Sequence, residues 1–170
     1  MATLTPYAVA SLIVNCAYDA VDHTGDLEIS RRGVVIGEIA WDDCQCGQLV
    51  ITEQRRFPSR LFPLEEIDHQ AECGEPWLVV VYVLSLTRCV PGPDNNGNPP
   101  SVEDLSAAAQ QLSADMSKIR WAVMCCLTNE YDSSHVDAFA LGAQEVVGPQ
   151  GSCAGSELTI QVGWTQDCGC

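Results

Sequence analysis

Residues Trp77 to Thr87 read W-L-V-V-V-Y-V-L-S-L-T, and every side chain in this stretch except those of Ser85 and Thr87 is apolar or aromatic. Valine favours extended backbone, because its branched side chain is stiff and packs well on a pleated surface. A near-continuous apolar run of this length is typical of a central strand that is covered on both faces. Prolines at positions 76, 91 and 93 bound the run, since proline lacks the amide proton that a sheet ladder needs. We therefore predict that residues 77–87 form the middle strand of a sheet.

Two helices are predicted to pack with this strand. Residues 7–20 have helix-spaced apolar side chains, and Thr5 and Pro6 suit the N-cap and the first helical position. Residues 101–127 begin with Ser101 and an acid three residues later, which resembles a capping box. They carry an apolar stripe about six turns long, which we expect to lie across the sheet. The stripe consists of Leu105, Ala109, Leu112, Met116, Ile119, Val123 and Cys126.

Four further segments predict strands. Residues 33–41 and 48–53 are rich in β-branched side chains and are joined by the turn-rich link 42–47, which predicts a hairpin. Residues 139–147 read as a strand, a loop follows at 148–155, and residues 156–165 alternate apolar and polar side chains. The apolar face of that last strand consists of Leu158, Ile160, Val162 and Trp164.

The expected fold is a single α+β domain. It has a mixed, mostly antiparallel sheet, with the N-terminal helix and one long amphipathic helix packed on it. Residues 91–100, P-G-P-D-N-N-G-N-P-P, hold nothing that can pack, so we expect an exposed loop at 90–100.

The charge of the chain excludes some functions. Eight basic residues face 23 acidic ones, and the formal net charge is −15. Such a protein repels a DNA duplex, which argues against sequence-specific DNA binding, but a surface past which DNA must slide benefits from negative charge. Neither a signal peptide nor a transmembrane segment is recognised, so we expect synthesis in a cytoplasm.

Ten cysteines leave several interpretations open. Cys16, Cys125 and Cys126 fall on helical patterns, and we expect them to be small core residues. The other seven lie in loops or at the ends of strands, where disulfides are one possibility. A zinc site is the alternative, although structural zinc sites usually leave two to four residues between paired ligands rather than one. The candidate ligands are Cys44, Cys46, Cys168 and Cys170.

No catalytic motif stands out in the sequence. It contains no phosphate-binding glycine loop, no G-x-S-x-G and no H-E-x-x-H, so nothing argues for an enzyme or for a cofactor. Five of the eight basic side chains lie between Arg31 and Arg60. Clustered arginines in an acidic protein often pair with carboxylates of a neighbouring subunit, and pairing within the chain is the alternative.

The order of the predicted elements resembles the tail terminator proteins of long-tailed bacteriophages. It runs from the helix at 7–20 and the hairpin at 33–53 to the long strand at 77–87, the loop, the amphipathic helix at 101–127 and two closing strands. The resemblance rests on pattern and order over most of the chain. The cysteine-bearing link at 42–47 and the C-G-C end are not part of it. A neighbouring head–tail connector or tail tube protein, or a cysteine-based metal-binding module, therefore remains an alternative.

The resemblance implies a structural protein of the virion, assembled in the host cytoplasm. Such a protein forms a homohexameric ring on the finished tail tube, stops its growth and presents a surface to the head connector or stopper protein. DNA passes through the ring without sequence-specific binding, and no membrane takes part. By analogy, the subunit contacts are expected at the arginine segment, the 91–100 loop and the hairpin. The residues we name for these contacts are Arg55, Arg56, Arg60, Asp94, Asn95 and Asn96.

Overall fold

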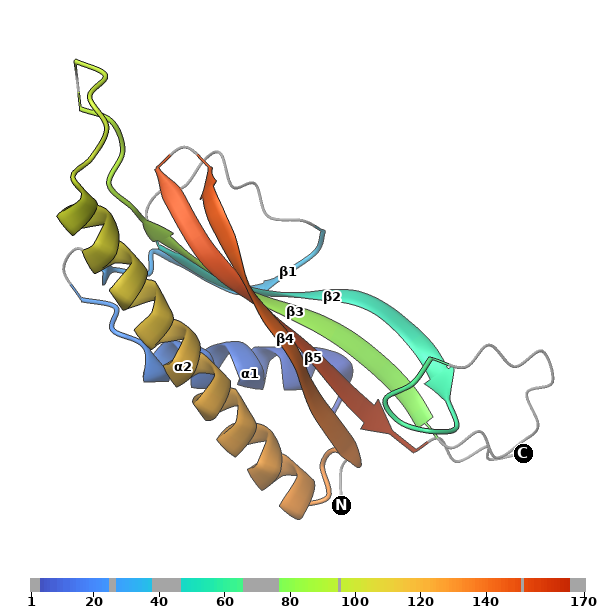
Figure 1. Ribbon diagram of the computed structural model, residues 1–170. Coiled ribbons are helices and arrows are strands. Elements are labelled where there is room, and N and C mark those ends of the chain that lie inside the picture. Colours follow the sequence, from blue (N-terminus) through green and yellow to red (C-terminus); the bar gives the residue numbers. More distant parts are fainter. Residues whose placement is uncertain are drawn as a thin grey trace.

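A five-stranded sheet carries two helices on one of its faces (Figure 1). The computed structural model describes residues 4–24, 27–37, 47–65, 77–94, 96–150 and 152–165. The pair β1–β2 is parallel and the other strand pairs are antiparallel, which confirms the predicted α+β class with a mixed, mostly antiparallel sheet. In chain order the elements are α1 (Pro6–Ala20), β1 (Arg31–Val35), β2 (Gln48–Ser59), β3 (Trp77–Cys89), α2 (Val102–Asp132), β4 (Ala138–Gln150) and β5 (Cys153–Trp164).

Strand β3 is the middle strand of the sheet, as its apolar run predicts. The strand order is β1-β2-β3-β5-β4, and β3 pairs antiparallel with β2 on one side and β5 on the other. Val80 and Tyr82 join the main core beneath the helices. On the opposite face, Val79 and Val81 are buried in a smaller cluster with Phe57. Burial on both faces explains why this strand has almost no polar residues.

The hairpin predicted for residues 33–53 is wrong, because its two strands run parallel. Arg31 of β1 lies opposite Gln48 of β2, and the register continues in the same direction along both strands. Parallel neighbours need a connection of about a dozen residues rather than a tight turn. Residues 36–47 supply that length, and 38–46 of them lie outside the described residues. β-Branched composition predicts strands but not their relative direction.

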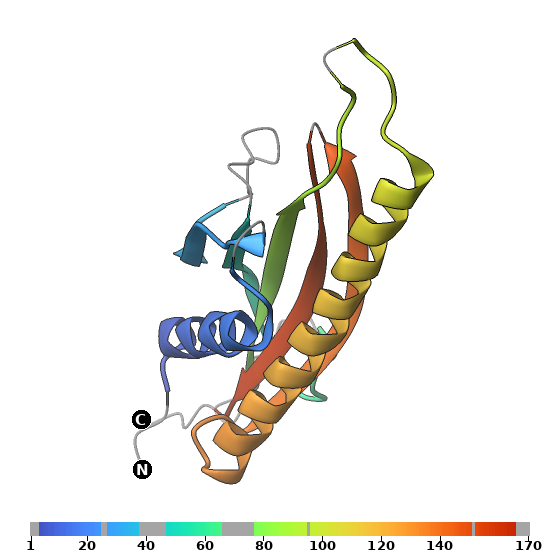
Figure 2. The same ribbon diagram turned by 90° about the vertical axis from the view of Figure 1, so that its left-hand side faces the viewer.

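The two helices bury one face of the sheet between them. Figure 2 shows α1 and α2 against the same face, with α1 beside β1 and β2 and α2 along β4 and β5. Val9 and Ile13 of α1 and Ile119 and Val123 of α2 are buried in one core with the strands. Each large apolar side chain buried in this way stabilises the fold by about 1.5–3 kcal/mol.

Both helices begin where their capping residues predict. The Thr5 hydroxyl accepts a hydrogen bond from the backbone N–H of Ala8 at 3.2 Å, and the Ser101 hydroxyl accepts one from Asp104 at 3.1 Å. These bonds satisfy N–H groups that have no partner within the helix. Helix α2 continues through Asp132, further than the apolar stripe predicts.

The stripe on α2 is not buried along its whole length, contrary to our expectation. Leu112, Ile119 and Val123 are buried, whereas Leu105 and Ala109 are exposed. The first turns of α2 therefore carry apolar side chains that the core formed by the described residues does not cover. Heptad spacing shows which side of a helix is apolar but not how far the core extends beneath it.

Strands β4 and β5 pair as a hairpin, and each is longer than the strand predicted from the sequence. Leu158 and Ile160 lie in the main core, as the alternation in this strand predicts. The loop expected at 148–155 is mostly strand, since β4 ends at Gln150 and β5 begins at Cys153. The turn of this hairpin lies at the same end of the sheet as the beginning of α2 (Figure 1).

Candidate functional site

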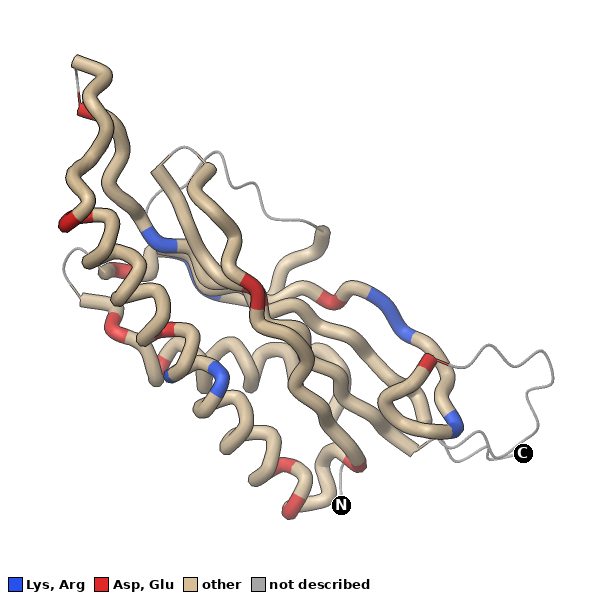
Figure 3. Tube along the Cα trace, viewed as in Figure 1, with Lys and Arg blue, Asp and Glu red and all other residues tan. Residues whose placement is uncertain are grey.

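The residues proposed for subunit contacts form two groups that lie toward opposite ends of the sheet. Arg55 and Arg56 are in β2 and Arg60 follows it, whereas Asp94 and Asn96 lie in the loop after β3. Because β2 and β3 are antiparallel and Arg56 lies opposite Val80, most of the length of β3 separates the two groups. Its 13 residues span about 40 Å at about 3.4 Å each. Figure 3 shows the basic segment toward one end of the sheet, and acidic residues both beside it and at the other end.

The arginines at the end of β2 are paired within the chain. The register of β2 shifts between Glu53 and Arg55, which marks a bulge. Arg56 donates to both carboxylate oxygens of Glu53, one of them at 2.8 Å, and Arg55 forms an ion pair with Glu65. The bond to Glu53 raises the pKa of the Arg56 guanidinium. These exposed pairs contribute at most about 1 kcal/mol each, and a guanidinium has five N–H donors, so they leave donors for further contacts.

The loop between β3 and α2 is organised by Asp94. Its carboxylate accepts hydrogen bonds at 2.8 Å from the backbone N–H groups of Asn96 and Asn98 and from the Asn98 side chain. The bonds from Asn98 hold the pKa of Asp94 below its ordinary value. Asn95, also proposed for subunit contact, lies outside the described residues. The loop thus presents a negative charge on a defined turn that projects beyond the sheet (Figure 1).

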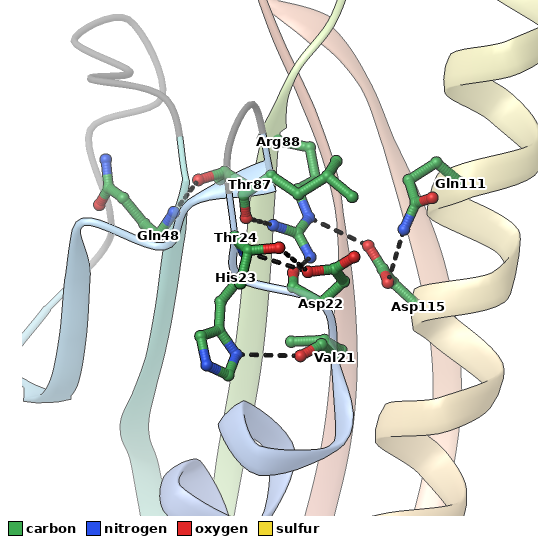
Figure 4. Close-up of polar contacts among 10 residues, drawn as sticks. Val21, Asp22, His23, Thr24, Gln48, Thr87, Arg88, Gln111 and Asp115 are labelled. Atoms are coloured by element: carbon green, nitrogen blue, oxygen red, sulfur yellow. Dashed lines mark hydrogen bonds and ion pairs between the residues drawn. The ribbon is translucent and has the colours of Figure 1, made fainter.

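A buried polar network ties this end of the sheet to the helices (Figure 4). Arg88 of β3 donates from Nε to Oδ2 of Asp115 in α2 at 3.0 Å, and Gln111 donates to the other carboxylate oxygen at 3.1 Å. The remaining nitrogens of the guanidinium donate to the backbone carbonyls of Asp22, at 2.6 Å, and of Leu27. The side chains of Arg88 and Asp115 are 6% and 0% exposed, so we assign this network a structural role.

An apolar groove opens beside this network, between the first turns of α2 and the β4–β5 hairpin. Its volume is about 210 Å³, and Leu105 and Val146 at its edge are well exposed. The groove lies on the part of the α2 stripe that the core leaves uncovered. Its main lining residues are Pro91, Leu105, Ala109, Leu112, Val146 and Pro149.

A second hollow, of about 440 Å³, lies between the start of α1 and strands β1 and β2. The hydroxyl of Tyr82 lies at this hollow and donates to the backbone carbonyl of Pro6 at 2.9 Å. Burial raises the pKa of Tyr82, so its hydroxyl stays protonated at neutral pH. Glu53 and Arg56, which also line the hollow, bind each other. The two charged groups at this hollow therefore neutralise each other, and they do not point together at a position where a ligand could bind.

The cysteines on the helices are not the small core residues that we predicted. Cys16 of α1 and Cys126 of α2 form a disulfide, with Cα atoms 6.6 Å apart, and Cys125 is a free, exposed thiol. Successive residues of a helix point about 100° apart, so Cys125 and Cys126 cannot both face the other helix. Cys89 and Cys153 are each disulfide-bonded, as the disulfide interpretation predicts.

The zinc hypothesis stays untested by the structure. The candidate ligands Cys44, Cys46, Cys168 and Cys170 all lie outside the described residues. Within the described ranges, no group of three or more His, Cys, Asp or Glu side chains is placed to hold a metal ion. Across the same residues, no helix is both long and apolar enough to cross a membrane.

The turn after β2 was not predicted from the sequence. Leu61 and Leu64 are 62% and 56% exposed, and they flank Phe62, which packs on Trp77 with ring centroids 6.0 Å apart. The signal was present as L-F-P-L between the arginines and the acidic segment that follows. No protein-family model matches the chain, and no curated protein shows significant similarity to it.

Proposed function

We propose that the chain is a structural virion protein that forms a ring at the junction between the tail and the head of a long-tailed bacteriophage, as a tail terminator does. The element order that motivates the resemblance is supported by the fold: a helix, paired strands, a long apolar strand, a projecting loop, a long helix and two closing strands. The parallel β1–β2 pair is the point at which the fold departs from our expectation.

The observation that carries the proposal is exposed apolar surface at both ends of one sheet. Leu61 and Leu64 form one exposed site, and Leu105 and Val146 form the other. Exposed apolar patches commonly mark protein–protein interaction sites. Two different sites at opposite ends allow each copy to bind two neighbours, which is the arrangement of a ring with head-to-tail contacts.

The charge of the chain suits a ring around DNA. With a net charge of −15, a copy repels the phosphate backbone, so DNA passes through the ring without sticking to it. In this proposal the ring is a homohexamer, the tail tube protein binds one side of it and the head connector or stopper protein binds the other. The exposed loop between β3 and α2 is available for such contacts.

Electron microscopy of phage particles tests the proposal. We expect density for this chain as a closed collar between tail tube and head, and tails of uncontrolled length that lack heads when the chain is deleted. Restoring the chain in trans is the control, and it should restore tail length and head joining. Density elsewhere in the particle, or normal tails without the chain, would contradict the proposal.

A further inference from the structure

The apolar groove at one end of the sheet lacks an occupant among the described residues. It lies between the first turns of α2 and the β4–β5 hairpin, with a volume of about 210 Å³. An apolar cavity of about 150 Å³ is large enough to bind benzene. The groove therefore has room for one or two aliphatic side chains. Leu105, 44% exposed, and Val146, 63% exposed, form its accessible edge.

The opposite end of the same chain carries a protrusion of matching chemistry. The leucine turn, residues 61–64, is closed by a hydrogen bond from the Leu64 N–H to the Leu61 carbonyl at 2.8 Å. Phe62 anchors it by packing on Trp77 and on Gly163, where a Cβ atom would lie only 2.9 Å from the Phe62 ring. Leu61 and Leu64 remain exposed. The turn thus offers two aliphatic side chains on a fixed support.

One copy cannot bring these two surfaces together. The leucine turn follows Ser59, which lies opposite Trp77 at the start of β3, whereas Pro91 in the groove follows the end of β3. The intervening strand spans about 40 Å, and it is paired on both sides in a sheet. Contact between the turn and the groove therefore requires two copies of the chain.

The net charges of the described residues beside the two surfaces are opposite in sign. The loop after β3 and the first turn of α2, at the groove end, contain three acidic residues, whereas the last part of β2 and the residue after it contain three arginines. Glu53 and Glu65 pair with two of the arginines and offset part of their charge, so we expect the electrostatic contribution to favour orientation more than affinity. The residues are Asp94, Glu103 and Asp104 at the groove end, and Arg55, Arg56 and Arg60 at the turn end.

We propose that the leucine turn of one copy inserts into the apolar groove of the next copy, with Leu61 and Leu64 against Leu105 and Val146. This inference rests on the proposed ring and names the contact that builds it. The contact joins two different surfaces, so it is heterologous and repeats from copy to copy. It also accounts for the apolar stripe of α2, whose first turns have no partner within the described part of their own chain.

The test uses two variants of the full chain, each with one surface disabled. The turn variant carries Leu61→Glu and Leu64→Glu, and the groove variant carries Leu105→Glu and Val146→Glu. All four side chains are exposed, so both variants should keep the circular dichroism spectrum of the wild type. Trp121→Glu is the matched control, because Trp121 is exposed on α2 outside both surfaces.

Sedimentation velocity at several concentrations gives the readout. We expect the wild type and the Trp121→Glu control to self-associate, and each double variant alone to be a monomer. An equimolar mixture of the two double variants should form dimers and nothing larger, because only one intact turn and one intact groove remain to pair. Alanine in place of glutamate should weaken association less.

The outcomes separate this inference from the proposed function. Oligomers that persist in both double variants would overturn the turn-in-groove contact while leaving the ring proposal standing. A mixture that stays monomeric, or a wild type that does not associate at any concentration, would also overturn the contact. The position of the chain in the phage particle tests the ring proposal independently.

Discussion

Two arginine–carboxylate pairs, one in each half of the sheet, differ in how deeply they are buried. At the groove end, Arg88 and Asp115 are 6% and 0% exposed and are enclosed by helices and backbone carbonyls. Toward the turn end, Arg56 pairs with Glu53 through two hydrogen bonds, and these side chains are 50% and 33% exposed. A buried pair fixes how elements meet, whereas an exposed pair holds charge at a surface where a partner can use it.

Breaking the buried pair should have the largest effect. Asp115→Ala leaves the Arg88 guanidinium buried without its carboxylate, and we expect the free energy of unfolding to fall by about 3–5 kcal/mol. Urea denaturation followed by circular dichroism measures the loss. Replacing both residues by apolar ones, Arg88→Met with Asp115→Leu, should cost clearly less. A loss below about 1 kcal/mol for Asp115→Ala would show that the pair does not hold α2 to β3.

Removing the anchor of the leucine turn should have a smaller effect. Phe62 is only half-buried, so we expect Phe62→Ala to cost about 1–3 kcal/mol, less than the 3–5 kcal/mol of a fully buried aromatic ring. It should also weaken self-association, because the turn loses its support. Leu61→Ala is the control for stability, with an expected change within about 0.5 kcal/mol. Equal stability losses in the two variants would contradict the anchoring role of Phe62.

Breaking the exposed pair should hardly change stability. We expect Arg56→Ala to lower the free energy of unfolding by less than about 1 kcal/mol, since exposed ion pairs are worth little. A double-mutant cycle with Glu53→Ala measures the coupling between the two side chains. If the same kind of cycle gave an equally large coupling energy for Arg88 and Asp115, the expected difference in stability contribution between the buried and the exposed pair would be contradicted.

The smallest expected effect is a local change in the loop at low pH. Hydrogen bonds lower the pKa of Asp94 in the folded protein, so their contribution is fully present above the ordinary value of 3.8 and is lost as the pH falls through the lower, folded value. Amide NMR signals of Asn96 and Asn98 should therefore stay constant down to about pH 4 and move only below it. A change in these amide signals between pH 5 and pH 4 would contradict the hydrogen bonds to Asp94 described for this loop.

Local signals in the sequence predict much of this fold. The valine-rich run predicts β3, Thr5 and Ser101 predict the starts of both helices, and the alternation in β5 predicts its buried face. Each of these depends on neighbours in the chain. The direction of β1 and the Cys16–Cys126 disulfide depend on residues that meet only after folding, so local patterns do not determine them.

The candidate surfaces are predictable only in part. The sequence draws attention to the arginines, but it does not show that Arg55 and Arg56 pair within the chain. A signal for the buried network was present, because Asp115 follows Leu112 by three residues and so lies on the apolar side of α2. An acid in that position needs a buried partner. The groove lies where the apolar stripe of α2 extends beyond the core. The sequence does not show where the core ends.

Native mass spectrometry of the purified chain, with and without reductant, tests the central claim most directly. That claim is that the two ends of the sheet join separate copies into a closed ring. The account predicts one dominant species at six times the chain mass of 18.3 kDa in both conditions, because non-covalent contacts hold the ring. A species at the mass of a single chain at every concentration, or oligomers that vanish when reductant is added, would contradict it.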